Sequence, residues 1–326
     1  MLTFRPYRPE DEQQCVELLQ SGHDPAFSVE RFRWLHFRNP LAPSVMVLGF
    51  ADERLVGLYS AIKKRVVLDG RVYIIGRDVD PVVHPSQRGR GVFSQLLTQA
   101  LAANQDIDFY CNFANRLSAP GFLKHGWSAI GSLADHVFQT GARSPLTTEF
   151  LYYLLTGARS WRCSPGDVRE KTASETAMLL PGNAAPVAGR CGVERSAEYL
   201  SWRYFTNPLI SYRYFLRFAG EALAALLIVR EFADSRTALV MELVSFTSDP
   251  ARIDPFLTVL KCEFPKYRLK TWSTMPAPAR RYFRSNFLKR GQGQPFFVRP
   301  APGRELPPAI FELNSWLVTH GDSEFL

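Results

Sequence analysis

The sequence predicts an α/β (α+β) fold that is present in two tandem copies. Strand-like runs rich in β-branched and aromatic residues alternate along the chain with amphipathic, helix-like runs. A glycine-rich turn joins one such strand to one such helix at residues 83–93. An internal repeat relates residues 30–58 to residues 198–226. With 326 residues, of which 46% are hydrophobic, the chain is long enough to form two cores.

The strand and the helix around the turn follow from their side-chain patterns. Residues 72–75 and 79–83 are rich in β-branched and aromatic side chains, which favours a strand. After the turn, apolar residues recur at helical spacing with polar residues on the other side, which predicts an amphipathic helix. These apolar positions are Val92, Phe93, Leu96, Leu97, Ala100 and Leu101.

The turn Arg88-Gly89-Arg90-Gly91 has the chemistry of an anion site. A helix start leaves its first amides without intrahelical partners and carries about half a positive charge from the peptide dipoles. Glycine lets backbone N–H groups approach a phosphate closely. Because Arg88 and Arg90 add full positive charges at the same place, the turn predicts a site for a phosphate or pyrophosphate group.

The segment Val83-x-Pro85-x-x-Arg88-Gly89-x-Gly91 resembles the pyrophosphate-binding motif of the GNAT superfamily of acyl-CoA-dependent N-acyltransferases. The resemblance implies a mixed, mostly antiparallel central sheet flanked by helices, with CoA pyrophosphate held by the loop amides. The chain departs from the family pattern at Phe93, where glycine or alanine is usual. Carried over residue by residue, the cofactor-binding residues are Val83, Arg88, Gly89, Arg90, Gly91, Val92 and Phe93.

A second part of the family pattern follows at residues 108–127. The segment from Asn115 to Gly126-Trp127 resembles the family's helix that runs from an asparagine to a Gly-aromatic pair. The resemblance implies that Asn115 helps to bind the pantetheine arm of CoA. The family commonly places a tyrosine, the proton donor to the departing thiolate, where this chain has Phe122. Either another group donates this proton, or the thiolate leaves unaided, which a thiol pKa of about 8.5 makes tolerable.

The resemblance implies an N-acyltransferase that moves an acetyl group from acetyl-CoA to a primary amine of a small-molecule acceptor. The amine attacks the thioester directly, and no covalent enzyme intermediate is required. The family's base is often a carboxylate on the strand that leads into the glycine-rich turn, where this chain carries Asp78 and Asp80. Strand alternation predicts that both lie on one face. Asp80 is the predicted catalytic base, and a solvent-facing charge is the alternative.

Two histidines lie close to these motifs in the sequence. His84 adjoins the turn and His125 belongs to the second motif, so each could shuttle a proton. Histidines at such positions more often face solvent or make structural hydrogen bonds. We therefore expect neither to act in the reaction.

The internal repeat predicts two copies of one domain. Trp34 aligns with Trp202, and the same separation, which we call the repeat spacing, relates the Asn-Pro-Leu segments that begin at Asn39 and Asn207. An Asn-Pro pair ends a helix, because proline moves the preceding residue out of the α region. The predicted domains are a GNAT-like acyl-CoA-binding domain at 1–140, a linker with a helix at 141–165, and a degenerate GNAT-like domain at 166–326.

The second copy lacks the means to bind CoA in the family's way. No glycine occurs between Glu221 and Arg290, and Pro255 removes an amide at the place that corresponds to the turn. We expect this copy to cover the first domain and to supply part of an acceptor pocket, to which an aromatic run could contribute; core packing is the alternative for that run. It comprises Trp202, Tyr204, Phe205, Tyr212, Tyr214 and Phe215.

Composition indicates which ligands, partners and compartment the protein can have. The formal net charge of +8 suits an anionic ligand such as CoA but decides little by itself. Five cysteines without paired spacing indicate reduced thiols in a cytoplasmic protein, and no metal site is expected. The longest apolar run, residues 223–229, is too short to cross a bilayer. We expect no membrane or nucleic-acid partner.

The C-terminal segment carries two further predictions. Residues 310–320 have the composition of a closing strand. The acidic residues Asp322 and Glu324 follow it, and a terminal acidic cluster of this kind is usually solvated; contact with a cationic acceptor or with the basic stretch 280–284 is the alternative.

Two other functions stay open at this point. One is a Fem-like transferase that takes an aminoacyl group from tRNA, since that group also pairs two GNAT-like domains. The intact turn at residues 88–93 argues against it, because aminoacyl-tRNA needs no pyrophosphate cradle. The other is a non-catalytic module that binds acyl-CoA, which Phe122 at the tyrosine position keeps open.

Overall fold

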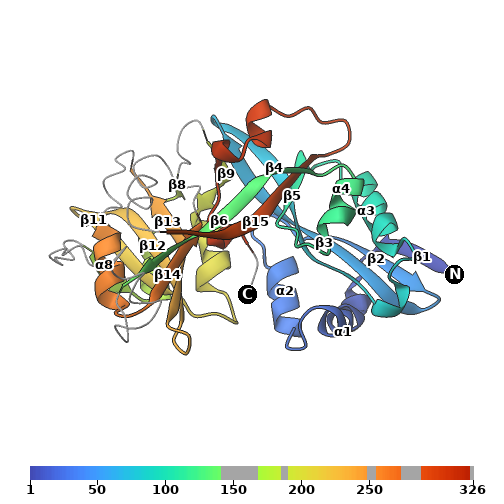
Figure 1. Ribbon diagram of the computed structural model, residues 1–326, viewed down its shortest axis with the longest axis horizontal. Coiled ribbons are helices and arrows are strands. Elements are labelled where there is room, and N and C mark those ends of the chain that lie inside the picture. Colours follow the sequence, from blue (N-terminus) through green and yellow to red (C-terminus); the bar gives the residue numbers. More distant parts are fainter. Residues whose placement is uncertain (141–167, 185–189, 248–254, 273–287, 324–326) are drawn as a thin grey trace. The chain divides into compact units, whose positions relative to one another are not determined.

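The computed structural model describes residues 1–140, 168–184, 190–247, 255–272 and 288–323 (Figure 1). They divide into two compact units, which we call unit 1 (Met1–Gly131 and Pro295–Leu313) and unit 2 (Ser132–Gln294 and Asn314–Leu326). The predicted linker at 141–165, with its helix, lies outside the described residues. The predicted domain boundaries stay a prediction, and each unit is described here by itself.

Unit 1 is built on a mixed, mostly antiparallel sheet with the strand order β1-β2-β3-β4-β5-β15. Strands β4 and β5 are parallel, and the other neighbours are antiparallel, which confirms the predicted fold class. The strands are β1 Leu2–Pro6, β2 Val45–Ala51, β3 Arg54–Leu68, β4 Arg71–Val83, β5 Phe109–Asn112 and β15 Leu288–Pro300. The helices are α1 Glu12–Gly22, α2 Val29–Phe37, α3 Val92–Ala103 and α4 Ala119–Lys124, with short 3-10 helices η1 Pro9–Asp11, η2 Pro85–Gln87 and η5 Pro308–Phe311.

Two helical layers cover the two faces of this sheet (Figure 1). Strand β2 alternates between them, because Met46 and Leu48 pack with α1 and α2 while Val45 and Val47 pack with α3. Helix α3 buries the apolar face that the sequence predicts, and its polar face is exposed. Helix α3, which follows the turn, is therefore held against the sheet by the burial of its apolar face alone.

Unit 2 repeats this architecture with the strand order β6-β14-β13-β12-β11-β7. Strands β13 and β14 are parallel, and the other neighbours are antiparallel. The strands are β6 Ser128–Gln139, β7 Val168–Lys171, β11 Arg213–Ala219, β12 Ala222–Phe232, β13 Thr237–Ser245 and β14 Arg268–Trp272, with short strands β8 Asn183–Ala184, β9 Cys191–Val193, β10 Arg195–Ser196 and β16 Trp316–Leu317. The helices are α6 Ala173–Leu179, α7 Ala197–Leu200, the π-helical η3 Ser201–Phe205, α8 Pro255–Glu263, η6 Leu313–Ser315 and η7 His320–Asp322.

The hairpins β2–β3 and β11–β12 have the same register when they are aligned by the repeat spacing. Val45 pairs with Ala61, and at the equivalent positions Arg213 pairs with Val229. Both hairpins carry a bulge at the corresponding place, after Gly49 in the first and after Arg217 in the second. An independently evolved hairpin would have no reason to share both register and bulge. These correspondences support the duplication, which we retain as a proposal.

The turns before the two hairpins also correspond. The Oδ1 atom of Asn39 accepts a hydrogen bond from Leu41 N–H at 3.2 Å, and Oδ1 of Asn207 accepts one from Leu209 N–H at 3.0 Å. In each case the asparagine side chain supports the turn that proline initiates after the helix. The predicted helix stop at Asn-Pro-Leu therefore has the same local structure in both copies.

Each half of the chain contributes a strand to the unit formed mainly by the other half. Strand β5 pairs antiparallel with β15 from the C-terminal part, and β14 pairs antiparallel with β6 from the N-terminal part. The compact units follow this exchange, since Pro295–Leu313 belongs to unit 1. Pairing between residues so far apart leaves no local pattern, so the sequence did not predict it.

The C-terminal segment forms short turns around a two-residue strand, Trp316–Leu317, so the predicted strand over residues 310–320 is largely wrong. A capping box between Thr319 and Asp322 turns the backbone into η7 and ends the extended conformation. Asp322 is also buried rather than solvated, with 5% of its surface exposed. The predicted solvation of this residue is therefore wrong.

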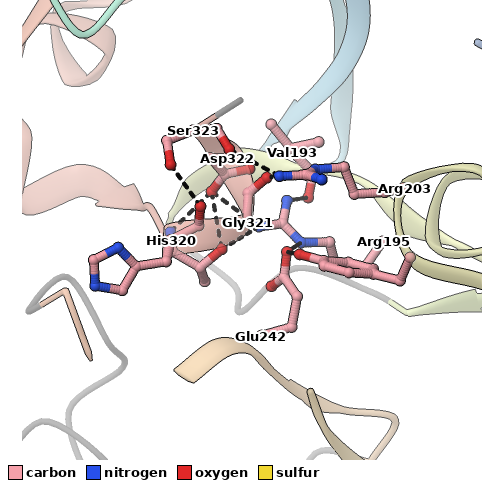
Figure 2. A network of polar contacts seen from close by, with 10 residues as sticks. Val193, Arg195, Arg203, Glu242, His320, Gly321, Asp322 and Ser323 are labelled. Atoms are coloured by element: carbon pink, nitrogen blue, oxygen red, sulfur yellow. Dashed lines mark hydrogen bonds and ion pairs between the residues drawn. The ribbon is translucent and has the colours of Figure 1, made fainter. Parts of the chain in front are cut away.

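A buried network of charges holds this segment in unit 2 (Figure 2). The guanidinium of Arg195 lies between two carboxylates, 3.1 Å from Glu242 and 2.9 Å from Asp322. The fully buried Arg203 donates to two backbone carbonyls of the segment, at 3.1 and 2.9 Å. Two cations and two carboxylates balance one another, as buried charges require.

Candidate functional site

The glycine-rich turn lies between β4 and α3, as predicted. Both Gly89 and Gly91 have a φ of 77°, and Gly91 is the N-cap residue of α3. A Cβ atom on either glycine would meet nothing within 4 Å, so the backbone conformation rather than crowding requires glycine. Arg88 and Arg90 are exposed beside them. The turn therefore faces open space.

The amides of this turn are available to a ligand. In the described part of the chain, the N–H groups of residues 89–93 donate to no other residue. The flanking amides are engaged, since Arg88 N–H donates to the Pro85 carbonyl and Gln95 N–H to that of Gly91. Free amides at the start of a twelve-residue helix, with the positive end of its dipole, are the requirement for binding a diphosphate.

The side chains of the predicted cofactor residues differ in their positions. Val92 is buried in the core, and Val83 is half-buried with its carbonyl accepting from Arg88 Nε at 3.2 Å. Phe93 turns toward α4, where its ring meets Phe122 edge-on at 5.3 Å. At Val92 and Phe93, the backbone N–H is therefore the group that can face a ligand.

Helix α4 packs against α3 through Phe93 and Phe122, the two residues at which the chain departs from the family pattern. A Cβ atom on Gly121 would lie 2.8 Å from the Phe93 ring, so glycine permits this close packing. Phe122 is 2% exposed and also contacts Trp127, with ring centroids 5.1 Å apart. Phenylalanine has no proton to donate, so at this position the fold supplies packing and no acid.

Asn115 has a structural role that the sequence did not predict. Its Oδ1 atom accepts hydrogen bonds from the N–H groups of Leu117 and Ser118, at 2.9 and 3.0 Å, and from the Ser118 hydroxyl at 3.2 Å. These bonds satisfy amides that precede α4. The Asn-x-x-Ser spacing was the signal for this turn. The predicted contact of Asn115 with pantetheine stays a prediction.

The prediction that Asp78 and Asp80 share a face stays a prediction, because β4 carries a bulge at Asp80, where regular strand alternation ends. Ser60 pairs with Val79 and Leu58 pairs with Val82, so Asp80 and the next residue both face a single residue of β3. Asp80 has a positive φ of 46° and is half-buried. Asp78 is buried, with 4% of its surface exposed. The two carboxylates therefore occupy different environments.

Asp78 lies where the parallel pairing of β4 and β5 stops, one residue after the pair Arg77–Cys111. It accepts hydrogen bonds from Tyr59 Oη at 2.5 Å and from Asn112 Nδ2 at 2.9 Å. Burial raises the pKa of Asp78 to about 7, although these hydrogen bonds oppose the shift. The sequence identified Asp78 as a candidate but not its raised pKa, because burial, which produces the shift, depends on the fold.

The two histidines make structural hydrogen bonds, as expected. His84 Nδ1 lies 2.8 Å from the Ser86 hydroxyl at the start of η2. His125 Nε2 lies 2.9 Å from the Ser94 hydroxyl in the first turn of α3. Partial burial lowers the pKa of His125, which favours its neutral form.

Residues 3–130 match the family model described as Acetyltransferase (GNAT) domain. This part of the chain is a GNAT domain. The match includes both motifs described above, and it lies within the N-terminal segment of unit 1. No curated protein matches the sequence.

Solved structures extend the likeness beyond the GNAT domain itself. A probable N-acyltransferase from Enterococcus faecalis is 15% identical with a TM-score of 0.67, over 92% of this chain and 73% of that chain. GCN5-related N-acetyltransferases from Anabaena variabilis and Kribbella flavida are 12% and 14% identical, with TM-scores of 0.65 and 0.63. They too match 92% of this chain, and 73% and 72% of their own chains. At these identities the likeness shows a shared fold.

Within the described ranges, no three His, Cys, Asp or Glu residues gather in a way that could hold a metal ion. Among the same residues, Cys15, Cys111, Cys191 and Cys262 form no disulfide, and Cys262 is exposed. Across that same part of the chain, the structure has no helix with the length and hydropathy of a membrane span.

Proposed function

We propose that this protein transfers an acetyl group from acetyl-CoA to a primary amine of a small-molecule acceptor. The observation that carries the proposal is the turn at residues 88–93, where free amides, a helix start and two arginines converge. A diphosphate is the anion that this arrangement suits, and CoA carries one beside its thioester arm. The same observation disfavours a Fem-like transferase, whose aminoacyl-tRNA donor needs no such cradle.

In this proposal the amides of residues 89–93 bind the pyrophosphate and the two arginines neutralise its charge. Arg90 is exposed and free to approach a phosphate, whereas Arg88 is tied to the Val83 carbonyl. Asn115 offers its amide nitrogen to the pantetheine arm, because its oxygen is already used by the turn before α4.

The amine must lose a proton as it attacks, and β4 offers two acceptors for it. Asp80 is half-buried at the bulge, close in the chain to the turn. Asp78 is buried at the point where β4 and β5 separate, and its pKa of about 7 suits a base at neutral pH. We retain Asp80 as the proposed base and add Asp78 as its rival.

A thiol-release assay tests the proposed activity. Purified protein is incubated with acetyl-CoA and a panel of primary amines, and free CoA is measured. Gly91→Glu places a carboxylate at the pyrophosphate position, so release should fall at least a hundredfold. Gly70→Glu is the matched control, because Gly70 also has a φ of 77° and open space around it but lies in the β3–β4 turn.

Release that is equal in the wild type and Gly91→Glu would contradict the proposal. The non-catalytic alternative makes a different prediction, which Phe122 at the usual tyrosine position motivates. It requires acetyl-CoA to bind tightly while no amine of the panel accelerates thiol release. Binding and release measured on one preparation therefore separate enzyme from binding module.

A further inference from the structure

Unit 2 contains a cavity of about 600 Å³ that the proposed acyl transfer does not use. It lies between the start of α6, the end of η3 and the start of β11. This volume is in the range of small-molecule sites, roughly 300–1,000 Å³. Four residues of the aromatic run singled out in the sequence line it: Tyr204, Phe205, Tyr212 and Tyr214.

The tyrosine hydroxyl groups of the aromatic walls take part in hydrogen bonds within the protein. Tyr204 Oη donates to Glu242, and Tyr214 Oη donates to the Tyr204 carbonyl. Tyr212 Oη accepts from a guanidinium of the buried network. Phe205 packs edge-on against Tyr214, with ring centroids 5.0 Å apart, and remains half-buried. Tyr204, Tyr212 and Tyr214 are only 1%, 8% and 4% exposed, so the ring that these walls leave most open to a ligand is that of Phe205.

The charged groups of the lining are already paired with one another. Lys171 Nζ lies 2.8 Å from Glu175, and Arg213 binds Glu170 through two nitrogens at 2.7 and 2.8 Å. Arg213 also binds Glu263, which lies outside the lining, at 2.7 Å, so each cation of the lining is paired with at least one carboxylate. A charged ligand would have to compete with these pairs, whereas an uncharged one would not.

The corresponding place in unit 1 is arranged differently. By the repeat spacing, His36 and Ser44 occupy the positions of Tyr204 and Tyr212, and they are joined by a hydrogen bond of 3.0 Å. Phe37, the counterpart of Phe205, contacts the Tyr7 ring with centroids 5.3 Å apart and is 38% exposed. The second copy has therefore replaced a polar contact with a pair of aromatic rings.

The loop after each helix also differs. Asn39 Nδ2 donates to the Lys63 carbonyl at 2.8 Å, which ties the loop to β3. Asn207 Nδ2 is buried and has no hydrogen-bond partner among the residues that the structure describes. The loop that borders the cavity in unit 2 thus lacks the tie that its counterpart has, which leaves room beside the rings.

We propose that this cavity binds a small, uncharged aromatic molecule against the half-buried ring of Phe205. Ring burial supplies the affinity, and the internally paired charges exclude ligands of either sign. The proposal does not rest on acyl transfer. It gives the second copy, which lacks the glycine-rich turn, a ligand site of its own.

Ligand-observed NMR on the full-length protein tests the chemical class with four probes. Benzamide is uncharged and aromatic, benzoate and benzylammonium add a charge of either sign, and cyclohexanecarboxamide lacks the ring. We expect saturable binding of benzamide, about tenfold tighter than that of the other three, because each of them loses one recognised property. Equal binding of all four probes, or no binding of benzamide, would overturn the proposal.

Variants of one aromatic position test the location. Phe205→Ala should weaken benzamide binding about tenfold. Phe205→Leu keeps an apolar side chain, which guards against misfolding, and should weaken benzamide binding at least severalfold. Phe37→Ala, at the corresponding place in unit 1, should leave it unchanged. Unaltered binding in Phe205→Leu would place the molecule elsewhere and refute the site. Gly91→Glu should leave benzamide binding intact, so failure of the acetyl-CoA site and failure of this site are distinguishable.

Discussion

At the scale of single residues, the decisive feature of the GNAT domain is how β4 presents its carboxylates. Asp78 lies in regular pairing with Ala61 and is buried, whereas Asp80 lies in the bulge opposite Tyr59 and is half-buried. The positive φ of Asp80 suits aspartate or asparagine better than most residues. The sequence revealed which residues carry the charge. The burial of one carboxylate and the backbone conformation of the other could be known only from the structure.

The ionisation of Asp78 makes stability depend on pH. Its pKa is about 7 in the folded protein and near 3.8 in an unfolded chain, so the folded state holds the proton more tightly. The contribution is fully present below pH 4 and is lost as pH rises to 7, by on the order of 4 kcal/mol. Asp78→Asn should flatten this decline in denaturant titrations across that range.

The control for this measurement is Asp69→Asn, a change of an exposed carboxylate in the β3–β4 turn. It should follow the wild-type pH profile. If Asp78→Asn shows the same decline as the wild type, the proton taken up between pH 4 and 7 belongs to another group.

Turnover distinguishes the two carboxylates as bases. Asp80→Asn keeps a residue that tolerates positive φ, and it should lower kcat about a hundredfold without weakening acetyl-CoA binding. Steady-state kinetics and a binding titration of the same preparation measure both. Unchanged turnover would remove Asp80 from the reaction. A comparable loss in Asp78→Asn, together with loss of a midpoint near pH 7 in kcat/KM, would assign the role to Asp78.

At the scale of elements, the strand–turn–helix from β4 to α3 was predictable because its residues obey local rules. Apolar spacing located the helix, and two glycines located positive φ. The C-terminal segment was not predictable in the same way. Its apolar and β-branched residues suggested a strand, yet the capping box at Thr319 and the buried ion pair of Asp322 fold it into turns.

Gly321 tests how strongly that segment depends on the network in Figure 2. A Cβ atom at this position would lie 1.8 Å from Tyr204 Oη and 2.3 Å from Glu242 Oε1. Gly321→Ala must therefore displace a buried hydrogen bond between them, and we expect a loss of about 3 kcal/mol in the free energy of unfolding. Gly182→Ala has open space around it and should change stability by less than about 0.5 kcal/mol. Equal stability of the two variants in denaturant titrations would contradict the role of the network.

At the scale of the whole molecule, the main feature is a repeat whose two copies differ from each other. The repeat spacing, visible in the sequence, reappears in hairpin register, in a bulge and in the turns at Asn39 and Asn207. The exchange of β6 and β15 was hidden, because it depends on partners far apart in the chain. The aromatic run of the second copy was recognised, but its division into core and cavity walls required the structure.

The measurement that tests the central claim most directly is the stoichiometry of acetyl-CoA binding by isothermal titration calorimetry. We expect one site per chain, since the glycine-rich turn has free amides at residues 89–93 and no glycine is available in the corresponding part of the second copy. Gly91→Glu should abolish this site, and Gly70→Glu should preserve it. Two sites per chain, or one site that survives Gly91→Glu, would contradict the account.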